Sequence, residues 1–190
     1  MLTELYFIRH GESPFVYGKE KERGLSEDGL KKSQKIADAL CEVEFSCIVS
    51  SSYKRAIDTV LPLAKQNNMI VETFDELVER PIKGLDYQME WSKLEEGIKL
   101  SFTDVDYSLP GGESTKGAQL RSIPVIENLL FTHYGKAIAI GTHGNIMTII
   151  LNYYDSTTYG YEFWKSTSKP DIYKASFDGN TLKGLTRVDF

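Results

Sequence analysis

The fold is decided near the start of the chain, by the stretch Leu5-Tyr6-Phe7-Ile8-Arg9-His10-Gly11. Its first four residues are apolar and favour strands, which is typical of a strand covered on both faces in a parallel sheet. The run ends on Arg9 and His10, and Gly11 then frees the backbone to turn away. Because open α/β folds bind ligands at the carboxyl ends of their strands, we expect both polar side chains to face a ligand.

The two polar residues of this stretch suit phosphate chemistry. A neutral imidazole such as that of His10 is a good nucleophile toward phosphorus, and the guanidinium of Arg9 can hold a phosphoryl group through two parallel hydrogen bonds. Together they predict phosphoryl transfer through a phosphohistidine.

Helices and strands alternate after this first strand. Ser26, followed by an acidic pair, predicts a helix start, and the inner face of that helix is predicted to carry Leu30, Ala37, Leu40 and Cys41. Short apolar strands are predicted at 47–50 and 69–74, and a triple serine after the first of these can cap the next helix. That helix is predicted to bury Ala56, Val60, Leu63 and Ala64. The alternation predicts an α/β fold with a mostly parallel central sheet and helices on both faces.

The second half of the chain predicts an interruption and then more of the sheet. Periodicity weakens over 81–113, where a helix over 87–100 is expected inside a lid-like insertion at the sheet edge. A helix over 114–134, a fully apolar strand over 137–141 and a helix over 146–151 follow. Residues 172–177 and 181–188, joined by a turn with Gly179, predict an antiparallel C-terminal hairpin.

The composition limits the classes of protein and of partner. A chain of 190 residues with 41% hydrophobic content can form one substantial core, so we expect 1–190 to be a single domain. A net charge of −5 argues against nucleic-acid or anionic-membrane partners, since these need an extended basic field. No stretch approaches ~18 consecutive apolar residues, which argues against a membrane span.

The start of the chain and its cysteines bear on location. Met1 leads almost directly into the first strand, with no basic and apolar leader pattern, which predicts a cytoplasmic protein. Cys41 and Cys47 lie in apolar surroundings and are predicted to be two reduced, buried thiols.

A second histidine and a second arginine are predicted to reach the same sheet edge as His10. The strand at 137–141 is followed by Thr142 and His143, and Arg55 falls in the first turn of the helix after the second strand. The N-terminus of that helix adds partial positive charge and free backbone donors. Each residue alone would more often be an ordinary packed or solvated side chain. Their joint placement predicts a functional site.

Four ordered motifs resemble the histidine phosphatase superfamily, also called the phosphoglycerate mutase-like group, branch one. They span most of the chain and comprise Arg9-His10-Gly11-Glu12, then Leu25-Ser26 with Gly29 and Gln34, then Ser50-Ser51 with Arg55, Ala56 and Thr59, and finally His143-Gly144. The resemblance implies the α/β fold expected above and phosphoryl transfer from a small phosphorylated substrate. No cofactor is expected for a hydrolase of this kind, whereas the alternative, a phosphoglycerate mutase-type phosphotransfer, would be cofactor-dependent.

The resemblance also implies roles for individual residues. His10 would be the nucleophile that becomes phosphorylated, while Arg9, Arg55, His143 and Gly144 would surround the phosphoryl oxygens. The general acid of the family follows the third strand in a Leu-x-Glu context, which here selects Glu79, with Glu76 as a nearby competitor and Glu12 as a residue that organises the loop. His133 at a helix end is predicted to be a C-terminal cap without a catalytic role.

One departure from the family pattern bears on the choice of activity. Phosphoglycerate mutases of the family continue the first motif with an asparagine that donates to the phosphate, whereas here Ser13 is followed by Pro14-Phe15-Val16. We therefore favour a metal-independent phosphomonoesterase over a mutase, with a non-catalytic phosphate-binding module as a third hypothesis. Three histidines and two separate cysteines give no zinc-site spacing, so no metal is expected.

Overall fold

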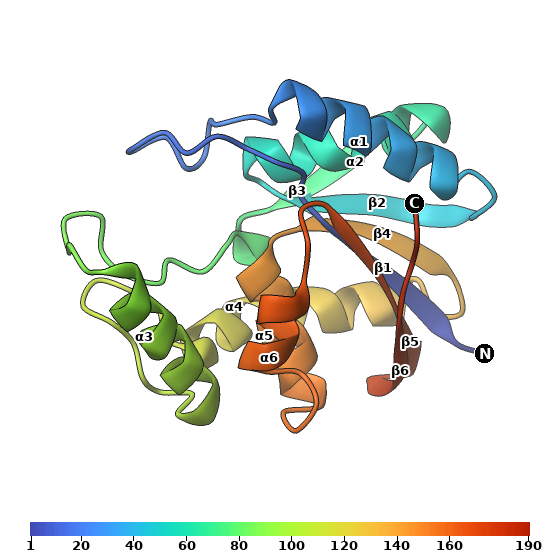
Figure 1. Ribbon diagram of the computed structural model, residues 1–190. Coiled ribbons are helices and arrows are strands. Elements are labelled where there is room, and N and C mark those ends of the chain that lie inside the picture. Colours follow the sequence, from blue (N-terminus) through green and yellow to red (C-terminus); the bar gives the residue numbers. More distant parts are fainter.

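The structure is a computed structural model that describes residues 1–190. It contains a six-stranded sheet with the order β3-β2-β4-β1-β5-β6 (Figure 1). Four strands are parallel to one another: β1 (Thr3–Arg9), β2 (Phe45–Ser51), β3 (Val71–Phe74) and β4 (Ala137–Thr142). The hairpin of β5 (Asp171–Asp178) and β6 (Thr181–Arg187) adds two antiparallel strands beside β1. The predicted mostly parallel sheet with an antiparallel C-terminal pair is confirmed.

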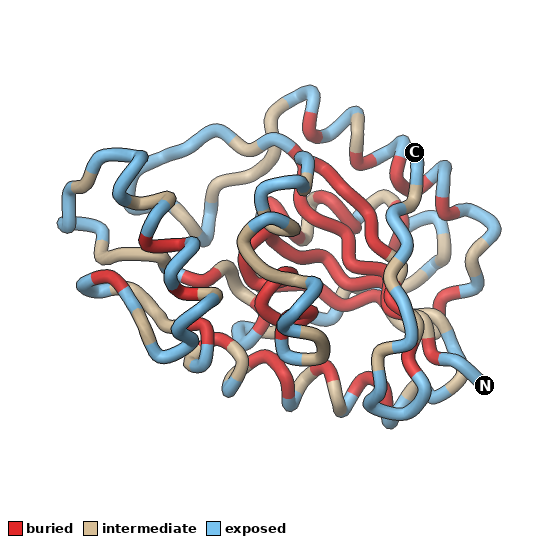
Figure 2. Tube along the Cα trace, turned by 60° about the horizontal axis from the view of Figure 1, so that its bottom comes forward, coloured by how far each residue is buried: buried red, intermediate tan, exposed pale blue.

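Helices cover both faces of the sheet (Figures 1 and 2). Alternate residues of β1 show the division, because Leu5 and Phe7 belong to one buried cluster and Tyr6 and Ile8 to the other. The first cluster packs against α4 (Thr115–Thr132) and α5 (Gly144–Tyr154), and the second against α1 (Glu27–Ala39) and α2 (Lys54–Gln66). The buried core in Figure 2 is therefore the sheet, enclosed by a helical layer on each side.

The prediction of buried residues is correct for α2 and partly wrong for α1. In α2, the four residues predicted to be buried are all buried. In α1, which starts at the Ser26 cap as predicted, Ala37 and Leu40 are buried, but Leu30 is 51% exposed and Cys41 is exposed. Leu30 lies in the first turn, off the stripe that faces the sheet, and Cys41 follows the helix end. The prediction of two buried thiols is therefore wrong for Cys41, and Cys47 is only partly buried.

The interruption between β3 and α4 holds a short 3₁₀ turn, η1 (Asp75–Leu77), and α3 (Trp91–Thr103). The helix predicted over 87–100 thus begins four residues later than expected and extends further. In Figure 1, α3 lies away from the sheet, and it contacts α6 (Tyr161–Ser166). His133 is the C-cap of α4, as predicted. None of the helices has the length and apolar character needed to cross a membrane.

Candidate active site

Strand register brings the two histidines together. Arg9 is the partner of Thr142 in the parallel pairing of β1 with β4, so His10 and His143 follow neighbouring strands at the same level. Their ring centroids are 5.1 Å apart, and both side chains are buried. The predicted meeting of two strand-end histidines at the carboxyl edge of the sheet is present in the structure.

Hydrogen bonds select the tautomer of His10. Its Nε2 accepts a hydrogen bond from Nε of Arg55 at 3.3 Å, so Nε2 carries the lone pair. Its Nδ1 therefore bears the proton, which it donates to the carbonyl oxygen of Gly11 at 2.7 Å. This arrangement holds the ring in place, with the Nε2 lone pair directed at the Arg55 guanidinium.

Arg55 is the most buried large cation of the site, with only 1% of its surface exposed. Its Nη1 donates to the backbone oxygen of Glu20 at 2.7 Å and lies 3.3 Å from the Glu20 carboxylate. Its Cζ lies 4.9 Å from the centre of the Tyr53 ring, a cation–π contact. Burial, followed by repulsion from Arg23, lowers the pKa of Arg55 to about 10. The group stays a cation at neutral pH.

Arg9 packs against the start of α5. Its Nη1 donates to the carbonyl oxygen of Thr167 at 3.0 Å and to the hydroxyl of the same residue, whereas its Nε is buried without a partner. A Cβ on Gly144 would lie 2.7 Å from the Arg9 Cζ. The structure therefore places Gly144 against the guanidinium, where only a residue without a side chain leaves enough room.

His143 is hydrogen-bonded to Ser51, one of the three serines predicted to cap α2. Its Nε2 lies 2.8 Å from the Ser51 hydroxyl, and its Nδ1 is buried without a partner. The triple serine was expected to cap α2, but the N-cap is Tyr53, with no side-chain hydrogen bond. The Ser51 hydroxyl accepts the backbone N–H of Tyr53 at 3.2 Å, and it also joins the end of β2 to His143.

Both histidines are neutral near pH 7. Burial is the main cause that lowers the pKa of His10 well below its usual range, and the positive charge of Arg55 is the next. Burial likewise lowers the pKa of His143, followed by the charge of His10 and then of Arg55. Burial first, and the neighbouring guanidinium groups second, thus keep both imidazoles unprotonated.

Glu79 reaches the site, whereas Glu76 does not. The Glu79 carboxylate accepts hydrogen bonds from the backbone N–H groups of Asn145 at 3.1 Å and Ile146 at 2.8 Å, in the first turn of α5. Glu76 is exposed, and only its backbone oxygen is engaged, by Arg121. Glu12 bonds to the Ser26 hydroxyl at 2.6 Å, which ties the loop after β1 to the start of α1.

Sequence reasoning missed three cations near the site: Arg23, Arg80 and Lys169. Arg23 donates to the Ser13 backbone and hydroxyl oxygens, and its charge acts on His143 and Arg55. Arg80 is buried and donates to the Thr115 hydroxyl at 3.2 Å. These cations come from loops or from the residue next to Glu79, where no periodic pattern marks them. The position of Arg80 directly after the predicted acid was the one available signal.

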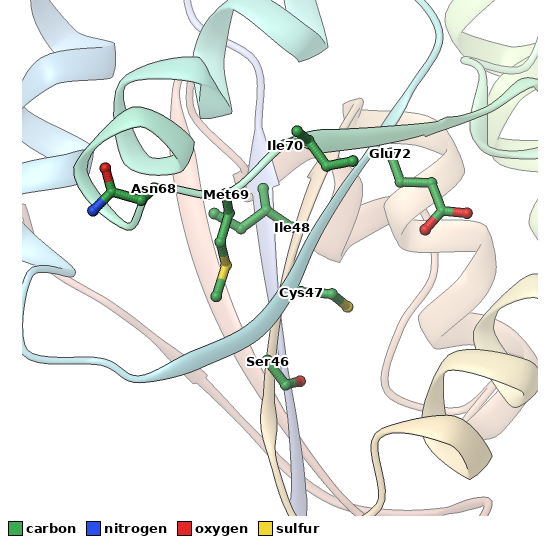
Figure 3. A pocket seen from close by; sticks show the side chains of 7 residues that line it. All are labelled: Ser46, Cys47, Ile48, Asn68, Met69, Ile70 and Glu72. Carbon is green, nitrogen blue, oxygen red and sulfur yellow. The ribbon is translucent and has the colours of Figure 1, made fainter.

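A separate hollow of about 430 Å³ lies between β2 and the segment that leads into β3 (Figure 3). Met69 and Ile48 lie side by side there, while Asn68 and Glu72 stand at opposite ends. Cys47 also lines it, and burial raises the pKa of that thiol to about 11, which disfavours a reactive thiolate. This hollow flanks the amino-terminal half of β2, whereas His10 and His143 lie at the carboxyl ends of their strands.

The donor set of the site suits an anion. Two neutral imidazoles lie among the guanidinium groups of Arg9 and Arg55, and the N-terminus of α5 adds partial positive charge. Such positive surroundings would repel a metal cation and attract a tetrahedral oxyanion. The fold and the site thus define an α/β protein with cationic and neutral donors for an anion gathered at the carboxyl edge of its sheet.

Comparisons with known proteins give the family. The family model described as "Histidine phosphatase superfamily (branch 1)" matches residues 5–181, and the chain belongs to this superfamily. Two relatives come from Arabidopsis thaliana. A metal-independent phosphoserine phosphatase is 33% identical, over 78% of this chain and 67% of its own length. Phosphoglycerate mutase-like protein 4 is 32% identical, over 76% of this chain and 68% of its own length.

Solved structures share the fold. Mycobacterial glucosyl-3-phosphoglycerate phosphatase in complex with inorganic phosphate matches with a TM-score of 0.76 and 20% identity, over 98% of this chain and 95% of that one. The same phosphatase in complex with VO3 matches with a TM-score of 0.76 and 21% identity, over 97% of each chain.

Proposed function

We propose that this histidine phosphatase hydrolyses a small phosphomonoester through a covalent phosphohistidine on His10. The observation that carries the proposal is the state of the His10 ring. It is buried and neutral, its Nδ1 proton is fixed on the Gly11 carbonyl, and its Nε2 lone pair points to the cationic centre of the site. A nucleophile prepared in this way needs no separate base.

In the first step, the Nε2 lone pair of His10 attacks phosphorus, and the bond from phosphorus to the substrate's ester oxygen breaks. Arg9, Arg55 and His143 stabilise the charge on the phosphoryl oxygens, and preorganised donors of this kind each contribute on the order of 10²–10³ in rate. The leaving oxygen takes a proton from Glu79 and departs as an alcohol.

The hydrogen bonds of Glu79 indicate which oxygen would carry that proton. Its Oε1 accepts two N–H groups, from Ile146 and from Arg80, whereas its Oε2 accepts one, from Asn145. Because a carboxyl oxygen has two lone pairs, Oε2 keeps one available for a proton. In the second step, water attacks the phosphohistidine, Glu79 takes a proton from that water, and inorganic phosphate leaves.

We further propose that the reaction needs no metal, that the substrate is small, and that the protein is cytoplasmic. The name of the phosphoserine phosphatase relative supports metal independence, as does the cationic donor set. The phosphate and vanadate complexes of the mycobacterial phosphatase support a small phosphorylated substrate. Cys41 and Cys47 are free thiols, which supports a cytoplasmic location. No feature of the acidic chain favours nucleic-acid or membrane partners.

We also propose that 1–190 acts as one domain in which 81–113 forms a lid beside the site. Residues of this segment line two hollows that adjoin the catalytic cluster. One, of about 310 Å³, lies between Tyr53, Glu79 and the stretch 80–85, and the other adjoins Arg9 and Trp91. A segment placed between solvent and the reacting groups can select substrates and limit water access.

Trapping of the phosphoenzyme tests the mechanism. After mixing with a radiolabelled aryl phosphate and quenching in base, we expect acid-labile, base-stable label on the wild-type protein and on His133→Ala. His10→Ala should carry no label and should lose at least ~10⁴ in kcat. Release of free phosphate rather than an isomerised phosphoester distinguishes a hydrolase from a mutase. Full turnover by His10→Ala would refute the mechanism, and full turnover in chelator is expected.

A further inference from the structure

The hydroxyl group of Ser51 lies buried between two partners. Ser51 is the last residue of β2, and its side chain is fully enclosed. The hydroxyl oxygen accepts the backbone N–H of Tyr53 at 3.2 Å and lies 2.8 Å from Nε2 of His143, and it makes no other hydrogen bond. A hydroxyl group has one proton to donate and two lone pairs that accept. The proton of Ser51 therefore has one neighbouring acceptor, which is Nε2 of His143.

These contacts select the tautomer of His143. The ring is neutral near pH 7, mainly because burial lowers its pKa, so only one of its nitrogens carries a proton. If Nε2 accepts the proton of Ser51, the ring proton is on Nδ1. In the other tautomer, Nε2 would donate to Ser51, and the hydroxyl proton would be buried without an acceptor. A buried donor without a partner shifts such an equilibrium by about 5- to 150-fold, in favour of the Nδ1–H form.

Nδ1 of His143 is then a hydrogen-bond donor that the protein leaves without a partner. The atom is buried and bonds to no protein group. A buried donor of this kind costs free energy, which a bound acceptor recovers. After burial and His10, the groups that lower the pKa of this ring are Arg55, Arg23 and Arg9. An acceptor among these cations is most favourable if it is an anionic oxygen.

The two histidines of the site thus carry their protons on the same atom but are held by opposite nitrogens. In His10, the Nδ1 proton is bound to the Gly11 carbonyl, and Nε2 keeps an electron pair. In His143, Nε2 is held by Ser51, and the Nδ1 proton is unpaired. One neutral ring therefore offers an electron pair and the other offers a proton donor. Because the ring centroids are 5.1 Å apart, both rings can contact one phosphoryl group.

We propose that Ser51 is a positioning residue that fixes His143 as an Nδ1–H donor, and that this donor binds an oxygen of the transferred phosphoryl group. The donor role rests on the function proposed above, whereas the tautomer is a property of the free protein. A neutral donor stabilises the charge that develops on the phosphoryl oxygen without giving up its proton. A carboxylate in place of the serine would instead favour the protonated imidazolium form.

Nitrogen-15 NMR of the free protein tests the tautomer. The chain has three histidines, and His133, at the end of α4, is an internal reference. Two-bond ¹H–¹⁵N spectra near neutral pH should show Nδ1 of His143 as the protonated nitrogen in the wild type. Ser51→Ala should lose this preference, and Ser51→Thr, which keeps the hydroxyl group, should restore it. Ser52→Ala is the matched control and should leave the tautomer unchanged, because Ser52 bonds to Asp75 instead.

Vanadate binding and kinetics test the donor role. Vanadate should shift the Nδ1 and attached proton resonances of His143 in the wild type, and by much less in Ser51→Ala. Because loss of a donor at the phosphoryl oxygens costs on the order of 10²–10³ in rate, a donor that is only partly lost in Ser51→Ala should lower kcat by about 10- to 100-fold. Ser52→Ala should keep the wild-type kcat.

The spectra separate the outcomes. An Nε2–H form in the wild type, or an unchanged tautomer in Ser51→Ala, overturns the positioning role of Ser51. Wild-type Nδ1 resonances that do not respond to vanadate overturn the donor role of His143. Lack of turnover of any phosphomonoester would instead refute the proposed function, and the spectra of the free protein would still decide about Ser51. If Ser51→Ala does not fold, the wild-type tautomer and its response to vanadate remain as the test.

Discussion

The strand-end cluster around His10 and the segment 81–113 are built in opposite ways. The cluster is buried and set by backbone pairing, with Arg9 opposite Thr142 in the parallel register. The segment follows the edge strand β3 and is more open to solvent, with Trp91 65% and Tyr87 38% exposed, although Phe102 packs against the core. In line with the proposed lid, we infer a division of labour, in which the sheet sets the chemistry and the attached segment adjusts which substrate reaches it. Substitutions in the two regions should therefore have different signatures.

Among substitutions that leave His10 in place, the largest effect is expected at Glu79. With an alkyl phosphate, Glu79→Gln should lower kcat by about 10²–10⁴, because the alkoxide leaving group then lacks a proton donor. With an aryl phosphate that has an acidic leaving group, the loss should be far smaller. Steady-state kinetics on both substrates measures this. Glu76→Gln, at an exposed position three residues earlier, is the control and should behave like wild type. Equal losses on both substrates would show that Glu79 has a structural role.

A somewhat smaller effect is expected at Arg55. Arg55→Lys keeps the charge but removes the planar fork that bonds to both His10 and Glu20, so kcat/KM should fall by about 10²–10³. Lys54→Arg, at the neighbouring exposed position, makes the opposite exchange and should have little effect. If Arg55→Lys kept wild-type kcat/KM, point charge alone would explain the role of this residue.

The cluster should also give the protein a distinct dependence of stability on pH. The folded-state pKa values of His10 and His143 lie well below the unfolded value of about 6.5, so the unfolded chain binds more protons as the pH falls through that value. The free energy of unfolding should then decrease below about pH 6.5, by up to ~1.4 kcal/mol per pH unit for each histidine. Urea denaturation between pH 7.5 and 5 measures the slope. His143→Gln should make it shallower, and His133→Gln should not.

The smallest effect is expected in the attached segment. Trp91→Ala should change the free energy of unfolding by no more than about 0.5 kcal/mol, because the side chain is mostly exposed. Its loss should alter kcat/KM ratios between substrates by about three- to tenfold through the lost ring contact. Phe131→Ala, at an 85% exposed position on α4, is the matched control and should change neither quantity. A Trp91→Ala protein with unchanged substrate ratios would contradict the division of labour.

The sequence predicted best what depends on periodicity. Apolar runs located β1 and β4, and because parallel strands end at a common edge, the meeting of His10 with His143 followed from them. Segment 81–113 has no such pattern, and its helix was placed four residues early. Whether Ser51 caps a helix or bonds to His143 depends on the neighbouring strand, which is a tertiary contact. The placement of Lys169 depends in the same way on how the chain between α6 and β5 passes the site.

The Arg55 side chain connects the proposed nucleophile to a loop of the structure. Arg55 donates to Nε2 of His10 and, through another nitrogen, to the backbone of Glu20 in the loop between β1 and α1. If a bound phosphoryl group attracts the Arg55 guanidinium, the position of the loop that contains Glu20 should change with it. Binding of the phosphoryl group should therefore be coupled to ordering of this loop. We expect hydrogen exchange of the backbone amides around Glu20 to slow when vanadate binds.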